Sequence, residues 1–460
     1  MKKNYVFILF FFFFAAMAKA NNIQLANILI NGQNTVGQFS LINFDVSWDN
    51  SWRTVTNEAN YDGAWVFAKF RKKTSNTWQH ATIAATGMTM PAGSFIKTAA
   101  DGKGVWIYRG STGVDFTGNV NYTGAKLQWN YGADGVLNTD SVEIRLFALE
   151  MVYVPSGAFS LGTAGSEAGH FFAGGTNNAY NVASEAAITV ANTPTNLFYA
   201  SSGDALGPIP AAYPKGFAAV WFMKYECCQQ QYTDFLNNLD AGRAANRYSS
   251  PITGSHPSYI APAPERAMGS TSYLDHLAFA DWAALRPFTE MEFEKAGRGV
   301  NQVPTPNEFA WGNTSIAPTT GVTNFGLATE LANNGNANYQ GSYGLQLRSG
   351  IYATASSNRT SSGGSFNGIM EMSGNVAEFA ISVGSTAARS FTGLHGDGNV
   401  DLNGGADVAN WPLTTAGLRG GNFTDAPGIL CLSDRTYANA SVAPTTRSGI
   451  YGFRLARTGE

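Results

Sequence analysis

The chain has 460 residues, of which 44% are hydrophobic and 13% charged, and its formal net charge is −3. This balance excludes an intrinsically disordered protein, and no basic stripe of the kind that binds nucleic acid follows the first residues. The 51 glycines and the 13% of aromatic residues favour short strands, tight turns and ordered loops over a helical bundle.

Residues 1–20 have the pattern of a secretory signal peptide. Two lysines precede the apolar run 5–17, and an Ala-Lys-Ala cleavage site ends at Ala20. We therefore expect an exported protein that starts at Asn21 and resides in the periplasm, at the cell surface or outside the cell. No other stretch is long and apolar enough to span a bilayer.

Residues 21–148 predict an all-β domain. Apolar and polar residues alternate through short segments, as at Phe44, Val46 and Trp48, and Gly, Asn and Asp clusters separate these segments. This period-two pattern is typical of an antiparallel β-sandwich. The segment lacks a grouping of residues typical of a catalytic centre, and we interpret His80 as structural or surface-exposed.

Residues 149–460 predict an irregular domain with long loops and few helices. Apolar residues at helical spacing indicate one helix over residues 228–239 and another over residues 274–284. Thr289 and Glu292 then form a capping box that starts a further helix. The polar stretch 163–215 is interpreted as an insertion loop.

From residue 151 onward, seven ordered segments resemble the formylglycine-generating enzyme (sulfatase-modifying factor) family. The segments are 151–162 (MVYVPSGAFSLG), 222–237 (FMKYECCQQQYTDFLN), 286–294 (RPFTEMEFE), 311–313 (WGN), 374–379 (GNVAEF), 419–423 (RGGNF) and 452–454 (GFR). The resemblance implies the family's C-type-lectin-like fold, an irregular α+β domain. It does not cover residues 21–148, although such β-segments precede this domain in surface proteins of Bacteroidetes-like bacteria.

The family enzymes oxidise a substrate cysteine with copper held by two cysteines, and the resemblance identifies the matching positions here. They fall at Asp425 and Leu430, with Cys431 one residue further on. Soft thiolates are the ligands that Cu(I) requires, and a carboxylate is a poor substitute. We therefore expect no copper site, because Cys227 and Cys228 lie far away in the sequence. The histidines also lack the pairing that an iron-dependent branch of the family uses.

The resemblance further implies a calcium site around the Gly-Asn-Val-Ala-Glu segment. Its ligands would be the carboxylates of Glu371 and Glu378 with the carbonyl oxygens of Gly374 and Val376. Ca²⁺ prefers such mixed oxygen ligands. The alternative is a carboxylate that caps local backbone N–H groups.

A second family calcium site would use Asn338 and the carbonyl of Tyr339, but the aspartate that completes it has no counterpart. Residues 397–404 place Asp and Asn at alternate positions before a glycine, like the start of an EF-hand loop. The closing glutamate is absent, so we expect a solvated turn there.

We therefore predict an exported surface or assembly protein whose family-like domain is non-catalytic and binds a protein or glycan partner. The alternative is a formylglycine-generating or other metal-dependent oxidase with relocated ligands. A third interpretation, a carbohydrate-binding module in residues 21–148, rests on aromatic residues that are more often part of a core. We expect no nucleic-acid partner, and no membrane span once the signal peptide is removed.

Overall fold

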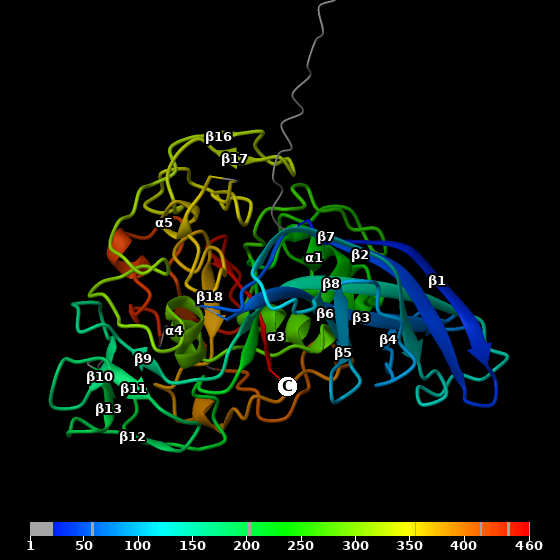
Figure 1. Ribbon diagram of the computed structural model, residues 1–460, viewed down its shortest axis with the longest axis horizontal. Coiled ribbons are helices and arrows are strands. Elements are labelled where there is room, and N and C mark those ends of the chain that lie inside the picture. Colours follow the sequence, from blue (N-terminus) through cyan, green and yellow to red (C-terminus); the bar gives the residue numbers. More distant parts are fainter. Residues whose placement is uncertain are drawn as a thin grey trace, which may run out of the picture.

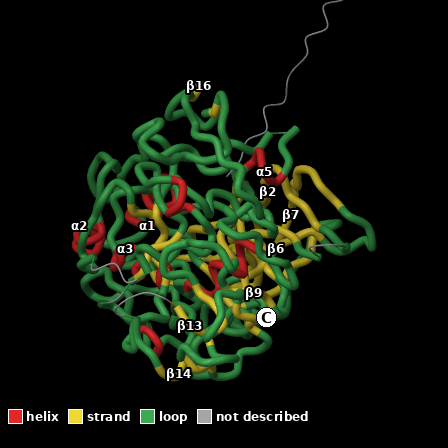
Figure 2. The backbone as a smooth tube through the Cα atoms, turned by 90° about the vertical axis from the view of Figure 1, so that its left-hand side faces the viewer, coloured by secondary structure: helices red, strands yellow, loops and turns green. Residues whose placement is uncertain are grey.

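The computed structural model describes residues 22–56, 59–199, 204–354, 356–414, 416–438 and 442–459. The predicted signal peptide lies outside these residues. Figure 1 shows a β-rich N-terminal part on the right and a loop-rich part on the left. Figure 2 shows how little of the backbone is helical. Within the described part, no helix combines the length and the apolar character needed to cross a bilayer.

The N-terminal part is built of antiparallel strands in two layers, as the alternating pattern predicts. Its strands are β1 (Gln24–Asn34), β2 (Phe39–Arg53), β3 (Tyr61–Lys72), β4 (Gln79–His80), β5 (Ser94–Thr98), β6 (Val105–Arg109), β7 (Phe116–Trp129) and β8 (Val142–Val154). One layer pairs β2 with β1 and β7, and the other pairs β3 with β4, β6 and β8. The layers join where Arg53 pairs with Tyr61. Buried side chains from both layers fill the space between them, among them Phe44, Val46 and Trp48.

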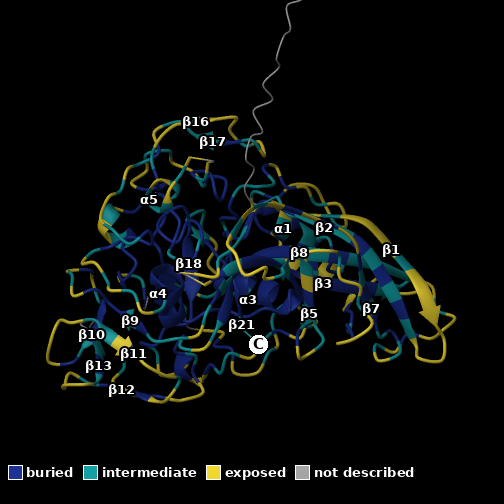
Figure 3. Cartoon of the chain, in the orientation of Figure 1, coloured by how far each residue is buried: buried dark blue, intermediate teal, exposed yellow. Residues whose placement is uncertain are grey.

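Strand β3 is buried on both faces. Ala64, Val66, Ala68 and Phe70 face the space between the two layers, whereas Trp65 and Phe67 face a second core that the C-terminal part supplies. Figure 3 shows this contrast between the buried middle of the sheet and the exposed strand β1. A strand with one apolar face would need only one core, so β3 ties the two parts of the chain together.

Strand β8 runs without interruption through the predicted boundary between residues 148 and 149. It pairs with β3 along its whole length, and its last residues pair with β15 (Val220–Met223). Strand β21 (Ala456–Thr458), near the end of the chain, pairs with β15 in turn. One sheet with the order β1-β2-β3-β8-β15-β21 therefore spans both parts.

The C-terminal part carries short helices, as predicted. Its helices are α1 (Gln229–Leu236), α2 (Ala241–Arg247), α3 (Tyr273–Trp282), α4 (Glu290–Arg298), α5 (Arg359–Ser362), η1 (Ala388–Ser390) and η2 (Pro427–Leu430). The two predicted helices correspond to α1 and α3. The predicted capping box starts α4, since the N–H of Glu292 donates to Thr289 and the N–H of Thr289 donates to Glu292. Sequence periodicity did not predict the short helix α2.

Short strands make up the rest of the regular structure. The segment interpreted as an insertion loop contains β10 (Phe171–Ala173), β11 (Tyr180–Val182), β12 (Ile188–Val190), β13 (Leu197–Tyr199) and β14 (Gly207–Ile209), and β11 pairs with β9 (Phe159–Leu161). The loop prediction was therefore wrong in detail, because strands this short give no clear alternation. The other strands are β16 (Val322–Thr323), β17 (Leu331–Ala332), β18 (Ala377–Ala380), β19 (Gly417–Arg419) and β20 (Tyr451–Gly452).

Candidate functional site

The two positions of the expected thiolate pair lie after β19, Asp425 in a turn and Leu430 at the end of η2. The carboxylate of Asp425 accepts hydrogen bonds from the N–H of Asn422 (2.9 Å) and from the hydroxyl of Tyr437 (2.9 Å). Leu430 is fully buried and packs in an aromatic cluster with Phe309 and Trp311. Both side chains therefore have structural roles, and neither is free to hold a soft metal.

Cys431 lies at the end of η2 and lines a cavity of about 430 Å³, which we call the Cys431 pocket. Its Sγ lies 3.4 Å from the carbonyl oxygen of Asn307. Burial, together with the negative charges of Glu167 and Asp434, raises the pKa of the thiol to about 12. Cys431 is therefore a neutral thiol at physiological pH, and the thiolate is the form that binds metals and reacts.

Two buried acids, Glu167 and Asp434, also line the Cys431 pocket. Glu167 accepts through one oxygen from the N–H of Asn307 (3.1 Å), while its Oε2 has no partner among the described residues. Asp434 accepts from the N–H groups of Thr436 (2.9 Å) and Ala168 (3.2 Å). The pocket therefore presents a thiol and two carboxylates, one of which has an unsatisfied oxygen.

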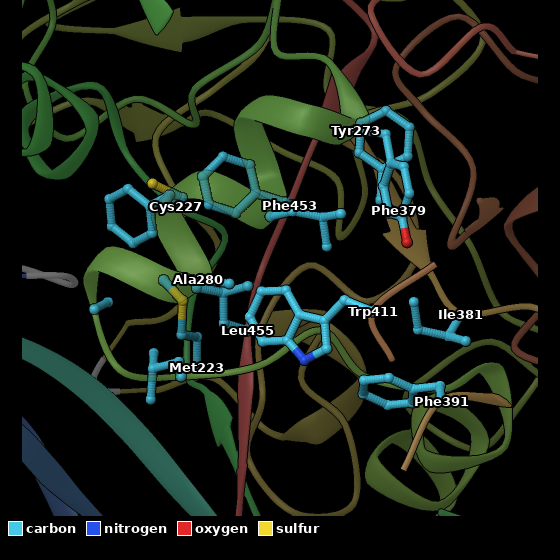
Figure 4. Close-up of a cluster of buried hydrophobic side chains, with 14 of the residues drawn as sticks. Met223, Cys227, Tyr273, Ala280, Phe379, Ile381, Phe391, Trp411, Phe453 and Leu455 are labelled. Atoms are coloured by element: carbon cyan, nitrogen blue, oxygen red, sulfur yellow. The ribbon is translucent and has the colours of Figure 1, made fainter. Parts of the chain in front are cut away.

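The other two cysteines do not complete the Cys431 pocket. Cys227 packs in the large core cluster drawn in Figure 4, and Cys431 belongs to a separate cluster. None of the three cysteines forms a disulfide bond. Burial raises the pKa of Cys227 well above its usual range, so it too is a buried neutral thiol.

The residues of the expected calcium site surround a buried group of acids. Glu371 accepts through Oε1 from the N–H of Gly350 (2.7 Å), and its Oε2 has no partner among the described residues. Burial raises the pKa of Glu371 to about 7. Its backbone has φ = 53°, in the left-handed region that costs energy for any residue with a Cβ. The fold thus positions this carboxylate at a backbone cost, a feature that often accompanies functional sites.

Glu378 has a partner that the sequence did not predict. Arg454 donates from Nε (2.7 Å) and Nη2 (2.5 Å) to the two carboxylate oxygens, and both side chains are buried. Such a two-pronged contact is the strongest geometry for this pair. Glu378 would therefore have to share an oxygen in order to bind a cation.

Glu226 joins this group although the sequence did not identify it as a ligand. Its carboxylate accepts from the N–H of Val376 (3.0 Å) and from the side-chain amide of Asn375. Burial and the neighbouring charges of Glu371 and Glu378 raise its pKa well above the usual range. The sequence contained one signal for Glu226: it is the glutamate that precedes the first helix in the family-like segment 222–237.

The second expected calcium site is less complete. The side-chain amide of Asn338 donates to the carbonyl of Leu345 (2.8 Å) and to Oδ1 of Asn375 (3.1 Å), and its own Oδ1 has no partner among the described residues. The carbonyl of Tyr339 accepts from the N–H (3.2 Å) and the hydroxyl (2.9 Å) of Ser342. Tyr339 is therefore already used by a local turn.

A different trio of acids comes together where the loop with the EF-hand-like spacing meets α3. Candidate ligand atoms of Asp281, Asp397 and Asp407 lie within 4.8 Å of one another. Asp281 accepts from the N–H groups of Asp397 (3.0 Å) and Asp407 (3.1 Å), so it holds the loop against α3. Asp397 and Asp401 each accept from an N–H two residues further on, at 2.7 Å, which agrees with the predicted turn.

Comparison with known proteins identifies the family. Residues 142–459 match the description "sulfatase-modifying factor enzyme 1-like domain". The chain belongs to this family. The match begins with β8, and it leaves most of the N-terminal β-structure outside the domain.

Two further comparisons add nothing to this family assignment. The Major Tropism Determinant U1 variant, a solved structure, aligns with 68% of this chain and 64% of its own, at 16% identity and a TM-score of 0.26. A search of curated proteins gave no match.

The sulfatase-modifying factor family uses metals in ways that can be tested against these residues. For copper, the donor set does not fit, because the two positions carry a hydrogen-bonded carboxylate and a buried leucine. For calcium, the fit is partial. Glu371 offers an unsatisfied carboxylate oxygen beside the Gly-Asn-Val-Ala-Glu segment, whereas Glu378 is bound by Arg454.

Proposed function

We propose that this protein is an exported surface or assembly protein whose sulfatase-modifying-factor-like domain binds a partner and does not oxidise one. One observation carries the proposal: Asp425 and Leu430, at the positions that the resemblance assigns to the family's thiolate pair, are held by hydrogen bonds and by packing. The remaining thiol, Cys431, has a pKa of about 12 and no second sulfur beside it in its cluster.

The Cys431 pocket supports a binding role. Its two buried acids give it a negative electrostatic potential, and the unsatisfied oxygen of Glu167 requires a hydrogen-bond donor. A basic side chain of a protein partner would supply both a positive charge and that donor. A glycan partner, which has no such charge, would leave the acids uncompensated, so we assign the pocket to a protein.

The calcium site is part of the same proposal. Glu371, with the carbonyl oxygens of Gly374 and Val376, would hold one Ca²⁺ that offsets the buried negative charge of Glu226 and Glu371. This ion would stabilise the domain and take no part in a reaction. The C-type-lectin-like topology implied by the sequence stays a prediction.

The alternative function is a metal-dependent oxidase with relocated ligands. A single feature favours it, the position of Cys431 on the wall of a cavity large enough for a side chain. Turnover of a cysteine-containing peptide separates the two functions.

Affinity capture tests the binding role directly. The mature protein, secreted by its native host, should begin at Asn21 and should co-purify with a protein partner. Glu167→Gln should lose that partner, because it removes the charge while keeping the shape of the side chain. Glu143→Gln, a charge change on β8 outside the pocket, should retain it. Retention of the partner by Glu167→Gln contradicts the assignment of this pocket.

A further inference from the structure

A groove runs along the seam between the N-terminal β-structure and the family domain. Its largest cavity, about 710 Å³, lies between Arg71, Trp78 and Arg145 on one side and the segment from Asn237 to Gly242 on the other. A neighbouring cavity of about 600 Å³ shares Arg145 and Asn237 with it. These volumes are typical of ligand pockets. The groove is formed only when both parts of the chain are present.

Arg145 gives one wall of the groove a guanidinium that has no direct ion pair within the described part of the chain. Its Nη1 donates to the carbonyl oxygen of Asn237 (2.9 Å), and it forms no ion pair with any described residue. It lies 4.5 Å from the ring centroid of Trp78, and Arg71 lies 4.8 Å from the same ring. Burial and the nearby charge of Arg71 lower the pKa of Arg145, and the charges of Glu143 and Asp234 oppose this shift. Two guanidinium groups are thus held against the same ring, and one of them, Arg71, is paired with Glu143.

The acidic residues around the groove are already engaged. Glu143 pairs with Arg71 (2.7 Å), and Asp240 pairs with Arg243 (3.0 Å). Asp234 accepts from the side-chain amide of Gln230 (2.8 Å), and burial raises its pKa to about 6. The charges of Glu143 and Asp234 compensate part of the charge of Arg145, but neither forms an ion pair with it among the described residues. The guanidinium of Arg145 can therefore still contact an anion.

Amides and hydroxyls are also present in the groove. Asn76 and Ser258 line the main cavity, and Thr77, Gln79 and Asn238 line an adjoining cavity that shares Trp78. Asn238 is buried, and its side-chain amide nitrogen has no acceptor among the described residues. Amides and hydroxyls can both donate and accept, as sugar hydroxyls do.

From this combination we infer that the seam groove binds an acidic oligosaccharide, with a uronate carboxylate on Arg145 and sugar hydroxyls on the side-chain amides. Trp78 is a positioning residue, because its ring holds both guanidinium groups in place. An acidic peptide would match the charge of Arg145, but it offers the side-chain amides fewer groups that both donate and accept than a sugar does. This site is separate from the Cys431 pocket and does not depend on it.

Calorimetric titration of the mature chain with a panel of uronate oligosaccharides (galacturonate, glucuronate and mannuronate) tests the inference. The matched ligand control is the methyl ester of the same oligosaccharide, which keeps the sugar and removes the charge. We expect at least one uronate to bind, its ester to bind about tenfold more weakly or worse, and added salt to weaken the binding.

Arg145→Ala should weaken binding by about tenfold or more, Arg145→Lys should weaken it less, and Lys73→Ala, an exposed charge outside the groove, should have no effect. Thermal melting shows whether each variant folds, and Glu167→Gln should bind the sugar normally. The inference is wrong if no uronate binds, if the ester binds equally well, if folded Arg145→Ala binds like the wild type, or if polyglutamate competes at equal affinity.

Discussion

Lys69 on β3 donates from its Nζ to the carbonyl oxygen of Trp282 at the end of α3, over 2.6 Å. The same nitrogen donates to the carbonyl of Gly398 and lies 3.0 Å from Nδ1 of His80. Lys224 makes a reciprocal contact, since it comes from the family domain and pairs with Asp62 of β3 at 3.1 Å, as well as with Glu150 of β8 at 3.1 Å. Two buried lysines therefore join the two parts of the chain in opposite directions.

Lys69→Met should destabilise the protein by about 2–4 kcal/mol, because it leaves at least two buried carbonyl groups without a donor. The loss should be measured by denaturant unfolding. Lys73→Met, at an exposed position directly after β3, should change stability by less than about 0.5 kcal/mol. Equal stability of Lys69→Met and the wild type would show that the seam does not depend on this contact.

His276 on α3 predicts a specific acid sensitivity. Its ring lies between Phe379 and Phe453, neither ring nitrogen has a partner among the described residues, and burial lowers its pKa to about 3. Below about pH 6.5, His276 binds a proton in the unfolded chain but stays neutral in the folded chain. Stability should therefore fall, by up to about 1.4 kcal/mol per pH unit, as the pH drops from 6.5 towards 3.

His276→Phe should remove this loss, since phenylalanine fits an aromatic cluster and does not titrate. The measurement is the free energy of unfolding of both proteins across this pH range. The difference between the two curves should grow steadily with acid. Parallel curves would contradict the assignment of a buried neutral imidazole.

Glu371 predicts the opposite dependence on pH. Its pKa of about 7 lies above the ordinary value of 4.5, so the folded protein holds a proton that the unfolded chain releases. The resulting stability is complete below pH 4.5 and is lost as the pH rises through 7. Glu371→Gln should flatten this part of the curve in calcium-free buffer.

Calcium should reverse that loss, because it binds the ionised form of Glu371. At pH 8, chelation should lower the melting temperature of the wild type and leave Glu371→Gln unchanged. Glu143→Gln should respond to chelation like the wild type. A melting curve that is the same with and without chelator would refute the calcium site.

Glu378 is unsuitable for that calcium test, because its loss breaks the buried pair with Arg454. Arg454→Met should cost about 3–5 kcal/mol by leaving the Glu378 charge uncompensated. The double variant Arg454→Met/Glu378→Gln should be more stable than the sum of the two single effects predicts. Additive effects in a double-mutant cycle would mean that the pair is not coupled.

The sequence predicted the features that depend on local pattern. Alternation at Phe44, Val46 and Trp48 correctly indicated buried strand faces, and the spacing of Thr289 and Glu292 correctly indicated a capping box. The family resemblance was confirmed over residues 142–459. These patterns involve residues close together in the chain, so they can be recognised in a single amino-acid sequence.

Contacts between distant segments could not be predicted in this way. Nothing near Glu378 in the sequence indicates that Arg454 binds it, and nothing near Arg145 indicates a groove shared with Asn237. The sequence of strand β3 did not predict its second buried face, because a continuous apolar run also fits a buried helix segment. Such features depend on the arrangement of the whole chain.

The most direct test of the proposed function is turnover of a cysteine-containing sulfatase peptide. The mature protein should be incubated with copper, oxygen and the peptide, and the product should be read by mass spectrometry. We predict that the cysteine stays unchanged, because Asp425 and Leu430 replace the thiolate pair and Cys431 is a neutral thiol. Conversion of the cysteine to an aldehyde, lost in Cys431→Ser, would contradict the non-catalytic account and establish the oxidase.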